Sequence, residues 1–175
     1  NNIPSLHILF GSAQDLQACE QAGLLQRDQV QFHWQNQGWR DFDDFLASLT
    51  QEKRKKIRQE RRKVADAGVT FRAVRGPDMT EGDWALLLRC YQQTYWEHGN
   101  APYLTPAFFE AMRTDMTQNW LLFVAEHAGQ PIGISLICLH LDAQGQPEVA
   151  YGRYWGALAR VDCLHFEACY YQPIA

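Results

Sequence analysis

Three apolar runs follow one another between residues 120 and 156, and they predict a β-meander, the clearest element of the chain. Two short glycine-containing stretches, 127–130 and 142–147, separate the runs. Gly129 is free to take a positive φ in the first turn. Because loops this short force neighbouring strands to be antiparallel, we expect an antiparallel sheet. Its predicted strands are 120–126, 132–141 and 149–155.

The first fifty residues alternate strand and helix patterns. Residues 5–10 (SLHILF) predict a buried strand, and Ser12 is a suitable N-cap for a short helix after it. Residues 29–34 alternate polar and apolar side chains, which predicts a second strand. Asp41 then caps a second helix, and the acids of its first turn favour the helix dipole. The pattern is therefore βαβα.

Residues 50–67 predict a long charged helix with a narrow apolar stripe. Ile57 and Val64 are seven residues apart and lie on one face, while the other faces carry charge. Gly68 is expected to end this helix. Residues 69–74 alternate polar and apolar side chains and predict a strand.

Two amphipathic helices precede the meander. Thr80, with Asp83 at N3, is expected to cap the longer helix. Thr105 as N-cap and Pro106 at N1 begin the shorter helix. Its inward residues are expected to be Phe108, Phe109 and Met112. With a last helix expected after the meander, the order indicates an α+β domain, an arrangement that serves many unrelated functions.

Composition narrows the class of protein. The chain has 175 residues, of which 46% are hydrophobic, enough for a sizeable core. It has no apolar run of about 18 residues and no basic, cleavable leader, so we expect neither a transmembrane helix nor a secretory signal. The five cysteines are scattered and odd in number, which favours reduced thiols and a cytoplasmic protein.

The charge is unevenly distributed. The net charge is −4, yet eight of the sixteen basic residues, including every lysine, lie between Lys53 and Lys63. Such segregation indicates an anionic partner for this segment. The alternative is a long exposed helix whose charges are only solvated.

Several segments resemble a known family. They are QFHWQNQGWRDFDDFLASLTQEKRKKIRQERRKVADAGV, YWEHGNAPYLTPAFF, YGRYWG and LHFEACYYQPIA. The chain resembles, over its whole length, a bacterial family of FemAB-like predicted N-acyltransferases in the GNAT superfamily. The resemblance implies an α+β, GNAT-like fold. It also implies transfer of an acyl or aminoacyl group to an amine, in Fem-type enzymes from aminoacyl-tRNA to a peptidoglycan precursor.

The resemblance also implies a domain organisation. Fem-type enzymes look like two GNAT-like domains in tandem, and family members run longer at both ends. We therefore expect a fragment, in which residues 1–49 close a first domain and residues 50–175 open a second. The unpaired edges of its sheet predict self-association as a homodimer.

In GNAT-like folds the acyl group lies beside the fourth strand, which corresponds here to residues 149–155. The resemblance makes Arg153, Tyr154, Trp155 and Gly156 the expected donor-binding residues and Tyr151 a proton relay. Strand alternation would place Tyr151, Arg153 and Trp155 on one face. The alternative is that these aromatic residues only pack the sheet against helices.

The donor is expected to be acyl-CoA or aminoacyl-tRNA. GNAT relatives that bind acetyl-CoA carry Arg/Gln-x-x-Gly-x-Gly/Ala after the fourth strand, where backbone N–H groups hold the pyrophosphate. Arg153 and Gly156 have the right spacing, but Leu158 stands where the last small residue is expected. The match to an acetyl-CoA site is therefore incomplete.

The spacing Cys163-x-His165-x-Glu167-x-Cys169 has two interpretations. On a strand the four side chains would share one face and suit zinc. The resemblance makes this segment a helix, on which they spread around the axis, so no metal is expected. His165 and Glu167 then remain as a candidate acid/base pair or as structural residues.

Two further segments are functional candidates. Residues 100–104 form a loop between two helices and are a candidate substrate lid. The basic helix is expected to hold tRNA phosphates or a negatively charged lipid-linked precursor. Its candidate anion-binding residues are Lys55, Lys56, Arg58, Arg61 and Arg62. The competing hypothesis to a transferase is a non-catalytic binding module that docks an anionic partner through this helix.

Overall fold

The computed structural model describes residues 6–175, which fall into two compact units. The first unit ends at Gly38 and the second is Trp39–Ala175. Every buried apolar side chain among the described residues belongs to the second unit. The second unit therefore contains the core and is the part of the chain on which a site can be built.

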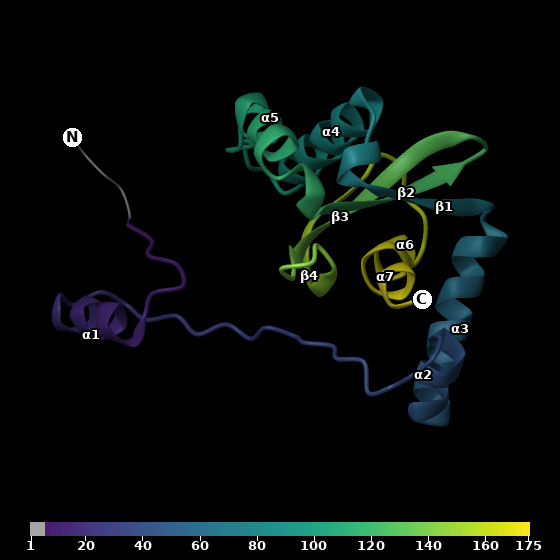
Figure 1. Ribbon diagram of the computed structural model, residues 1–175, viewed down its shortest axis with the longest axis horizontal. Helices are drawn as coiled ribbons and strands as arrows, with labels where there is room; N and C mark the ends of the chain where they lie inside the picture. Colours follow the sequence, from purple (N-terminus) through teal and green to yellow (C-terminus); the bar gives the residue numbers. More distant parts are fainter. Residues whose placement is uncertain (1–5) are drawn as a thin grey trace. The chain divides into compact units, whose positions relative to one another are not determined.

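The described part of the first unit is organised around α1 (Ala13–Gln21), shown in purple in Figure 1. The Ser12 backbone N–H donates to the Asp15 carboxylate at 2.9 Å, and the Ser12 hydroxyl accepts from the Asp15 N–H at 3.3 Å. This reciprocal capping box satisfies two N–H groups at the helix start. The predicted N-cap is confirmed.

Neither predicted strand of the first unit is formed within residues 6–38. Residues 29–34 are irregular, with Val30 and Phe32 80% and 94% exposed. Residues 6–10 are irregular too, and Ser5 lies outside the described residues. The strand predictions were wrong because alternation needs a partner ladder and a covering layer, and the described residues supply neither here.

The second unit is built on a four-stranded antiparallel sheet of order β1-β2-β3-β4. The strands are β1 (Val69–Arg75), β2 (Trp120–His127), β3 (Gln130–Leu141) and β4 (Pro147–Ala157). The predicted meander is confirmed, and Gly129 has the positive φ of 73° that its turn requires. No further strand pairs with the outer edges of β1 and β4 among the described residues.

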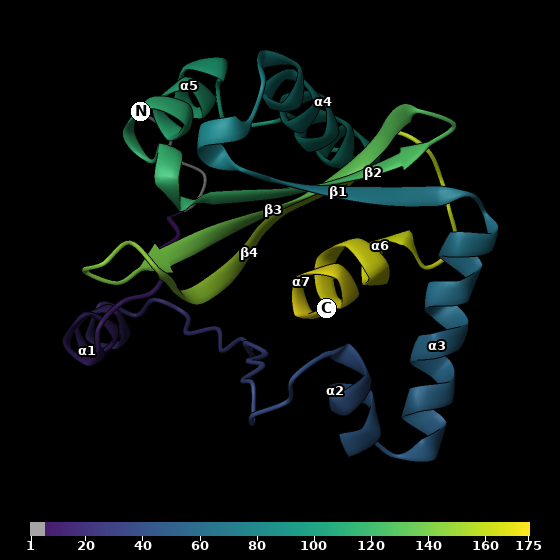
Figure 2. The same cartoon turned by 45° about the vertical axis from the view of Figure 1, so that its right-hand side comes forward.

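Helices α4 (Glu81–Glu97) and α5 (Pro106–Asp115) cover one face of the sheet (Figures 1 and 2). Short 3₁₀ turns, η1 (Gly76–Asp78) and η2 (Thr117–Asn119), connect these helices to β1 and β2. The predicted caps at Thr80 and Thr105 are confirmed by hydrogen bonds from the N3 backbone N–H to each threonine hydroxyl.

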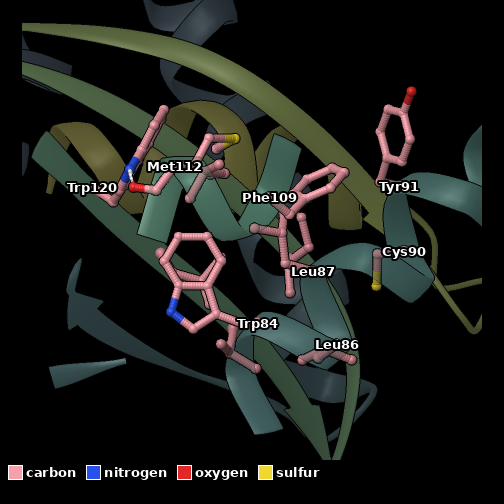
Figure 3. Packing of buried hydrophobic residues seen from close by; sticks show 12 residues of the cluster. Trp84, Leu86, Leu87, Cys90, Tyr91, Phe109, Met112 and Trp120 are labelled. Carbon is pink, nitrogen blue, oxygen red and sulfur yellow. Dashed lines mark hydrogen bonds between the residues drawn. The ribbon is translucent and has the colours of Figure 1, made fainter. Parts of the chain in front are cut away.

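The main apolar cluster lies between this helical layer and the sheet, and Figure 3 shows its packing. The indole N–H of Trp120 donates to the Met112 carbonyl oxygen at 2.9 Å, which ties β2 to α5. Phe109 is buried, but Phe108 is 42% exposed, so its predicted inward position is wrong. Successive helical residues are about 100° apart, and Phe109 with Met112 already defines the buried face.

The chain ends in a helical segment against the opposite face of the sheet (Figure 2). It consists of α6 (Leu164–Phe166), the π-helical turn η3 (Glu167–Tyr171) and α7 (Gln172–Ile174). This confirms the helix predicted after the meander. Leu164 packs with Val64 of the basic helix in a second buried cluster.

The basic helix is α3 (Gln51–Asp66), which Gly68 follows with a φ of 73°. Before it, α2 (Phe42–Ser48) is capped by Asp41, as predicted. The Phe42 ring lies 6.2 Å from that of Tyr171, so α2 packs within the second unit. The division into family domains after residue 49 stays a prediction.

Candidate functional site

Strand β4 contains a β-bulge at Arg153. Tyr154 pairs with Leu136 on β3, whereas Gly152 pairs with Ile137, so Arg153 is an extra residue between two ladder positions. A bulge of this kind bends the strand and shifts the alternation of every side chain beyond it.

The bulge corrects the predicted faces of β4. Tyr151 pairs with Cys138, which packs in the cluster under α4 and α5. Trp155 pairs with Ser135, which interacts with Cys169 of the C-terminal helical segment. Since cross-strand partners share a face, Tyr151 and Trp155 point to opposite sides of the sheet. The alternation argument was wrong because it assumed an unbroken strand.

A cavity of about 370 Å³ lies where β4 ends. The end of α4 contributes Glu97, β4 contributes Trp155, the following loop contributes Arg160 and Cys163, and α6 contributes His165. The remaining wall is mostly apolar. Trp155 and His165 are the two predicted site residues that the fold brings together in this cavity.

His165 is held by aromatic neighbours. Its ring centroid lies 5.3 Å from that of Trp155 and 5.8 Å from that of Tyr170. Burial lowers the pKa of His165 below the usual histidine value of 6.5, because desolvation disfavours the charged imidazolium. At neutral pH the side chain is therefore a neutral imidazole that can accept a proton.

Gly156 is required where α4 crosses β4. A Cβ at this position would overlap the carbonyl oxygen of Cys90 and lie 2.9 Å from the Cys90 Cβ. The Thr94 hydroxyl donates to the backbone oxygen of Trp155 at 3.1 Å and reinforces the contact. Close packing at Gly156 therefore positions Trp155 at the cavity.

A model of the FemAB-like family, described as peptidoglycan biosynthesis/recognition, matches residues 1–175. The chain belongs to the FemAB-like family. Its mixed α+β architecture with an open antiparallel sheet agrees with the GNAT-type fold of that family, so the predicted family and fold class are confirmed. No curated protein matches the chain.

Glu167 of the FemAB-like chain does not pair with His165. Its carboxylate accepts from the Arg61 guanidinium at 3.1 Å and from the Gln172 side-chain amide at 2.7 Å. Two helical residues separated by one position point away from each other. The structure thus places Glu167 in the contact between α3 and the C-terminal helical segment, beside a second cavity of about 440 Å³.

Tyr154 lies in an aromatic cluster on the α4 face. Its ring centroid is 5.5 Å from that of Tyr91 and 6.2 Å from that of Phe109. Burial raises the pKa of Tyr154, and the Arg153 guanidinium carbon lies 5.9 Å from its ring centroid. Tyr151, Arg153 and Tyr154 do not line the cavity at the end of β4.

The predicted lid, residues 100–104, is anchored to the same aromatic cluster. The backbone N–H of Leu104 donates to the Tyr91 hydroxyl at 3.0 Å. The Tyr103 ring packs 5.5 Å from Tyr95. Burial, reinforced by interactions with Tyr103, raises the pKa of Tyr95. The loop thus lies against the aromatic cluster; whether it acts as a lid stays a prediction.

Sequence reasoning missed Arg160 and Glu97. One feature of the sequence could have identified Arg160 as a site residue: it lies in the loop directly after the strand that is expected to hold the donor. No feature of the sequence could have identified Glu97, because only the crossing of α4 over β4 brings the end of that helix to the cavity.

The described residues also bear on metal binding and on the crossing of a membrane. Within residues 6–175 no group of three or more His, Cys, Asp or Glu side chains is arranged to hold a metal ion. None of the helices in this range combines the length and the apolar character needed to cross a membrane.

Proposed function

We propose that this FemAB-like protein transfers an acyl or aminoacyl group to an amine, with the cavity at the end of β4 as the reaction site. The acceptor we propose is an amine of a cell-wall precursor, and the donor is an acyl-CoA or an aminoacyl-tRNA in the cytoplasm. The observation that carries the proposal is one cavity that joins a neutral imidazole, a guanidinium group and an apolar wall.

Transfer of an acyl group to an amine needs a deprotonated nucleophile, a polarised carbonyl and alignment of the two. His165 accepts the proton that the amine loses as its nitrogen bonds to the carbonyl carbon. When the tetrahedral intermediate collapses, the bond from that carbon to the CoA sulfur or to the tRNA ester oxygen breaks, and the leaving group takes up the proton from His165. Arg160 stabilises the negative charge of the donor or of the developing oxyanion. Trp155 and its apolar neighbours position the acyl group, and about 370 Å³ accommodates a group of that size.

The residues at the bulge extend this proposal along β4. Tyr151 is 51% exposed, and Arg153 is exposed beside it. Tyr151 points to the opposite side of the sheet from Trp155. A donor that extends out of the cavity would therefore reach Tyr151 and Arg153 around the outer edge of β4, which no other strand covers among the described residues, and Arg153 would bind an anionic group there. The close packing at Gly156 keeps the strand in the position that both contacts require.

The test is a transfer assay with labelled acyl-CoA and labelled aminoacyl-tRNA as separate donors and a cell-wall precursor amine as acceptor. His165→Gln should lower kcat about 100-fold, since a positioned base contributes at least that much. His140→Gln is the matched control, because His140 is exposed on β3 and makes only a 3.8 Å pair with Glu148. Equal rates for the two variants would refute the role of His165.

The pH dependence provides a second readout. Because the pKa of His165 is lowered, the imidazole stays neutral down to a pH below 6.5. We expect kcat to rise with pH through that lowered pKa and to be level above it. An inflection above 6.5 that disappears in His165→Gln would contradict the lowered pKa, while absence of transfer from both donors would refute the proposed function.

A further inference from the structure

The second cavity lies beside the start of β1, away from the proposed reaction site. Its volume of about 440 Å³ is within the usual range of ligand pockets. Helix α3, strand β1 and the C-terminal helical segment line it, and the two helical segments lie side by side there (Figures 1 and 2). No residue lines both this cavity and the one at the end of β4, so the two are separate candidate sites.

Part of the positive charge of α3 gathers at this cavity. Of the five residues predicted to bind an anion, Arg61 and Arg62 line it and the other three do not. The Arg61 guanidinium is already paired with the Glu167 carboxylate at 3.1 Å. Arg62 is exposed, and within residues 6–175 no ion pair is found for it. Its guanidinium is therefore available to an anionic ligand.

The inner wall of the cavity is apolar. Val64 of α3 and Val69 of β1 are buried in one cluster, and the partly buried Phe71 packs against that cluster. A wall of this kind beside an exposed cation suits a ligand that carries an anionic group next to an apolar one.

The outer edge of β1 adjoins the cavity. The first three residues of the strand, Val69, Thr70 and Phe71, are part of the lining. Among the described residues no strand pairs with this edge, and Thr70 and Ala73 are exposed along it. Alternate residues of an edge strand direct their N–H and C=O groups outward, where they can pair with another chain. An extended segment can therefore add to β1 and reach the cavity.

We propose that the start of β1 binds the C-terminus of an extended peptide that ends in an apolar residue. A segment antiparallel to β1 has its C-terminal end beside the start of the strand, and thus at the cavity. Residues paired across a ladder share a face, so a terminal side chain opposite Phe71 points to the cavity side of the sheet. The terminal carboxylate then meets Arg62, while the peptide backbone pairs with β1.

A second copy of the chain fits this edge less well. Antiparallel pairing of two β1 strands over their full length would place Arg75 of the second copy opposite Val69. That cation would approach Arg62, and like charges at close range destabilise a strand pair. A terminal carboxylate at the same position has the complementary charge. Peptide binding is also independent of acyl transfer, because neither His165 nor Arg160 takes part in it.

The first experiment titrates the 175-residue protein into fluorescein-Ser-Thr-Ser-Val-Thr-Leu with a free C-terminus and follows the anisotropy. Amidation of the C-terminus should weaken binding about fivefold, the share of one exposed ion pair. Arg62→Gln should weaken binding of the free acid by the same factor, and amidation should then have no further effect. Lys55→Gln is the matched control, since Lys55 is exposed on α3 but does not line the cavity. Circular dichroism melts check that both variants fold.

The second experiment tests the strand pairing with two N-methylated forms of the peptide. Each carries methyl groups on alternate backbone nitrogens, in opposite phase, so that only one form blocks the edge that faces β1. One form should lose binding and the other should keep it. When the unmodified peptide binds, hydrogen exchange should slow at alternate amides of β1.

Each outcome decides the proposal. Loss of binding in one methylated form, together with the dependence on Arg62, supports it. Equal affinities of the two methylated forms, or of the acid and the amide, would overturn it. Absence of an anisotropy change up to about 1 mM protein, where even a weak site is half filled, would do so as well.

Two other occupants of the edge would also overturn the proposal. If acetyl-leucine bound as tightly as the peptide, the cavity would be a site for small carboxylates without strand addition. If the protein dimerised without peptide and its β1 amides were already protected, the edge would hold a second copy. Transfer activity is measured in a separate assay, so this proposal and the proposed function can fail independently.

Discussion

The pair between Arg61 and Glu167 makes a sharp prediction, because both residues are also candidates for function. The Arg61 guanidinium reaches the Glu167 carboxylate at 3.1 Å and lies over the Phe42 ring, 4.4 Å from its centroid. The Glu167 side chain is 5% exposed. We therefore expect the two residues to stabilise the fold by joining α3 to the C-terminal helical segment.

The perturbation is Arg61→Met, which keeps most of the aliphatic stem and removes the charge. Removing one partner of a fully buried ion pair costs about 3–5 kcal/mol, because the other charge stays buried and unpaired. Arg61 is 31% exposed, so water screens the pair, and Gln172 still donates to Glu167 in the variant. The expected loss in the free energy of unfolding is therefore about 2 kcal/mol.

The assay is urea denaturation followed by tryptophan fluorescence at pH 7, since Trp155 and Trp84 report on the second unit. Arg62→Met is the matched control, one residue along on the exposed face, and it should change the free energy of unfolding by less than about 0.5 kcal/mol. In a double-mutant cycle, Glu167→Gln combined with Arg61→Met should cost less than the sum of the single changes.

Two results would refute this reasoning. If Arg61→Met and Arg62→Met were equally stable, the pair would contribute nothing to the fold. If Glu167→Gln folded normally but lost transfer activity, Glu167 would act in the reaction and not in the helix contact.

Three further predictions follow from single contacts. Gly156→Ala should lower the free energy of unfolding by about 1–3 kcal/mol in thermal melts, because the added Cβ overlaps the Cys90 carbonyl oxygen. Gly152→Ala is the control and should leave the stability unchanged, since no atom lies within 4 Å of its added Cβ. Burial alone would raise the pKa of Asp83, but hydrogen bonds from Arg72 and from the helix cap lower it below 3.8. The ionised Asp83 therefore contributes fully to the free energy of unfolding above pH 3.8, and this contribution is lost as the pH falls through the lowered pKa. In Asp83→Asn, the free energy of unfolding should depend less on pH in that range. Burial raises the pKa of the Cys90 thiol to about 11, so it should react with a disulfide reagent at pH 8 only after urea unfolding; rapid labelling of the native protein would contradict its burial.

Local chemistry made several elements predictable. The capping boxes at Ser12 and Thr80 satisfy backbone N–H groups within three residues, so they depend little on distant parts of the chain. Gly129 and Gly68 take positive φ for reasons equally local. The same applies to the meander, whose short turns leave its strands no other pairing.

Other features depend on residues far apart in the sequence. The alternation at residues 29–34 predicts a strand equally well whether or not a partner strand exists, and the described residues supply none. The bulge at Arg153 appears only in the register between β3 and β4, and it alone places Tyr151 and Trp155 on opposite faces of the sheet. Local pattern cannot reveal either feature, because both are properties of strand pairing.

The sequence by itself determined the family, the order of helices and strands from residue 41 onward, and the concentration of positive charge in one helix. Composition, caps and turn residues act over a few positions, so they are visible along the chain. Only the tertiary structure decided which charges stay available, since the packing of α3 against the C-terminal helical segment takes Arg61 inward and leaves Lys55 and Arg62 in solvent. It also decided that Arg160 and His165 share a cavity, because the crossing of α4 over Gly156 and the turn after β4 bring them together.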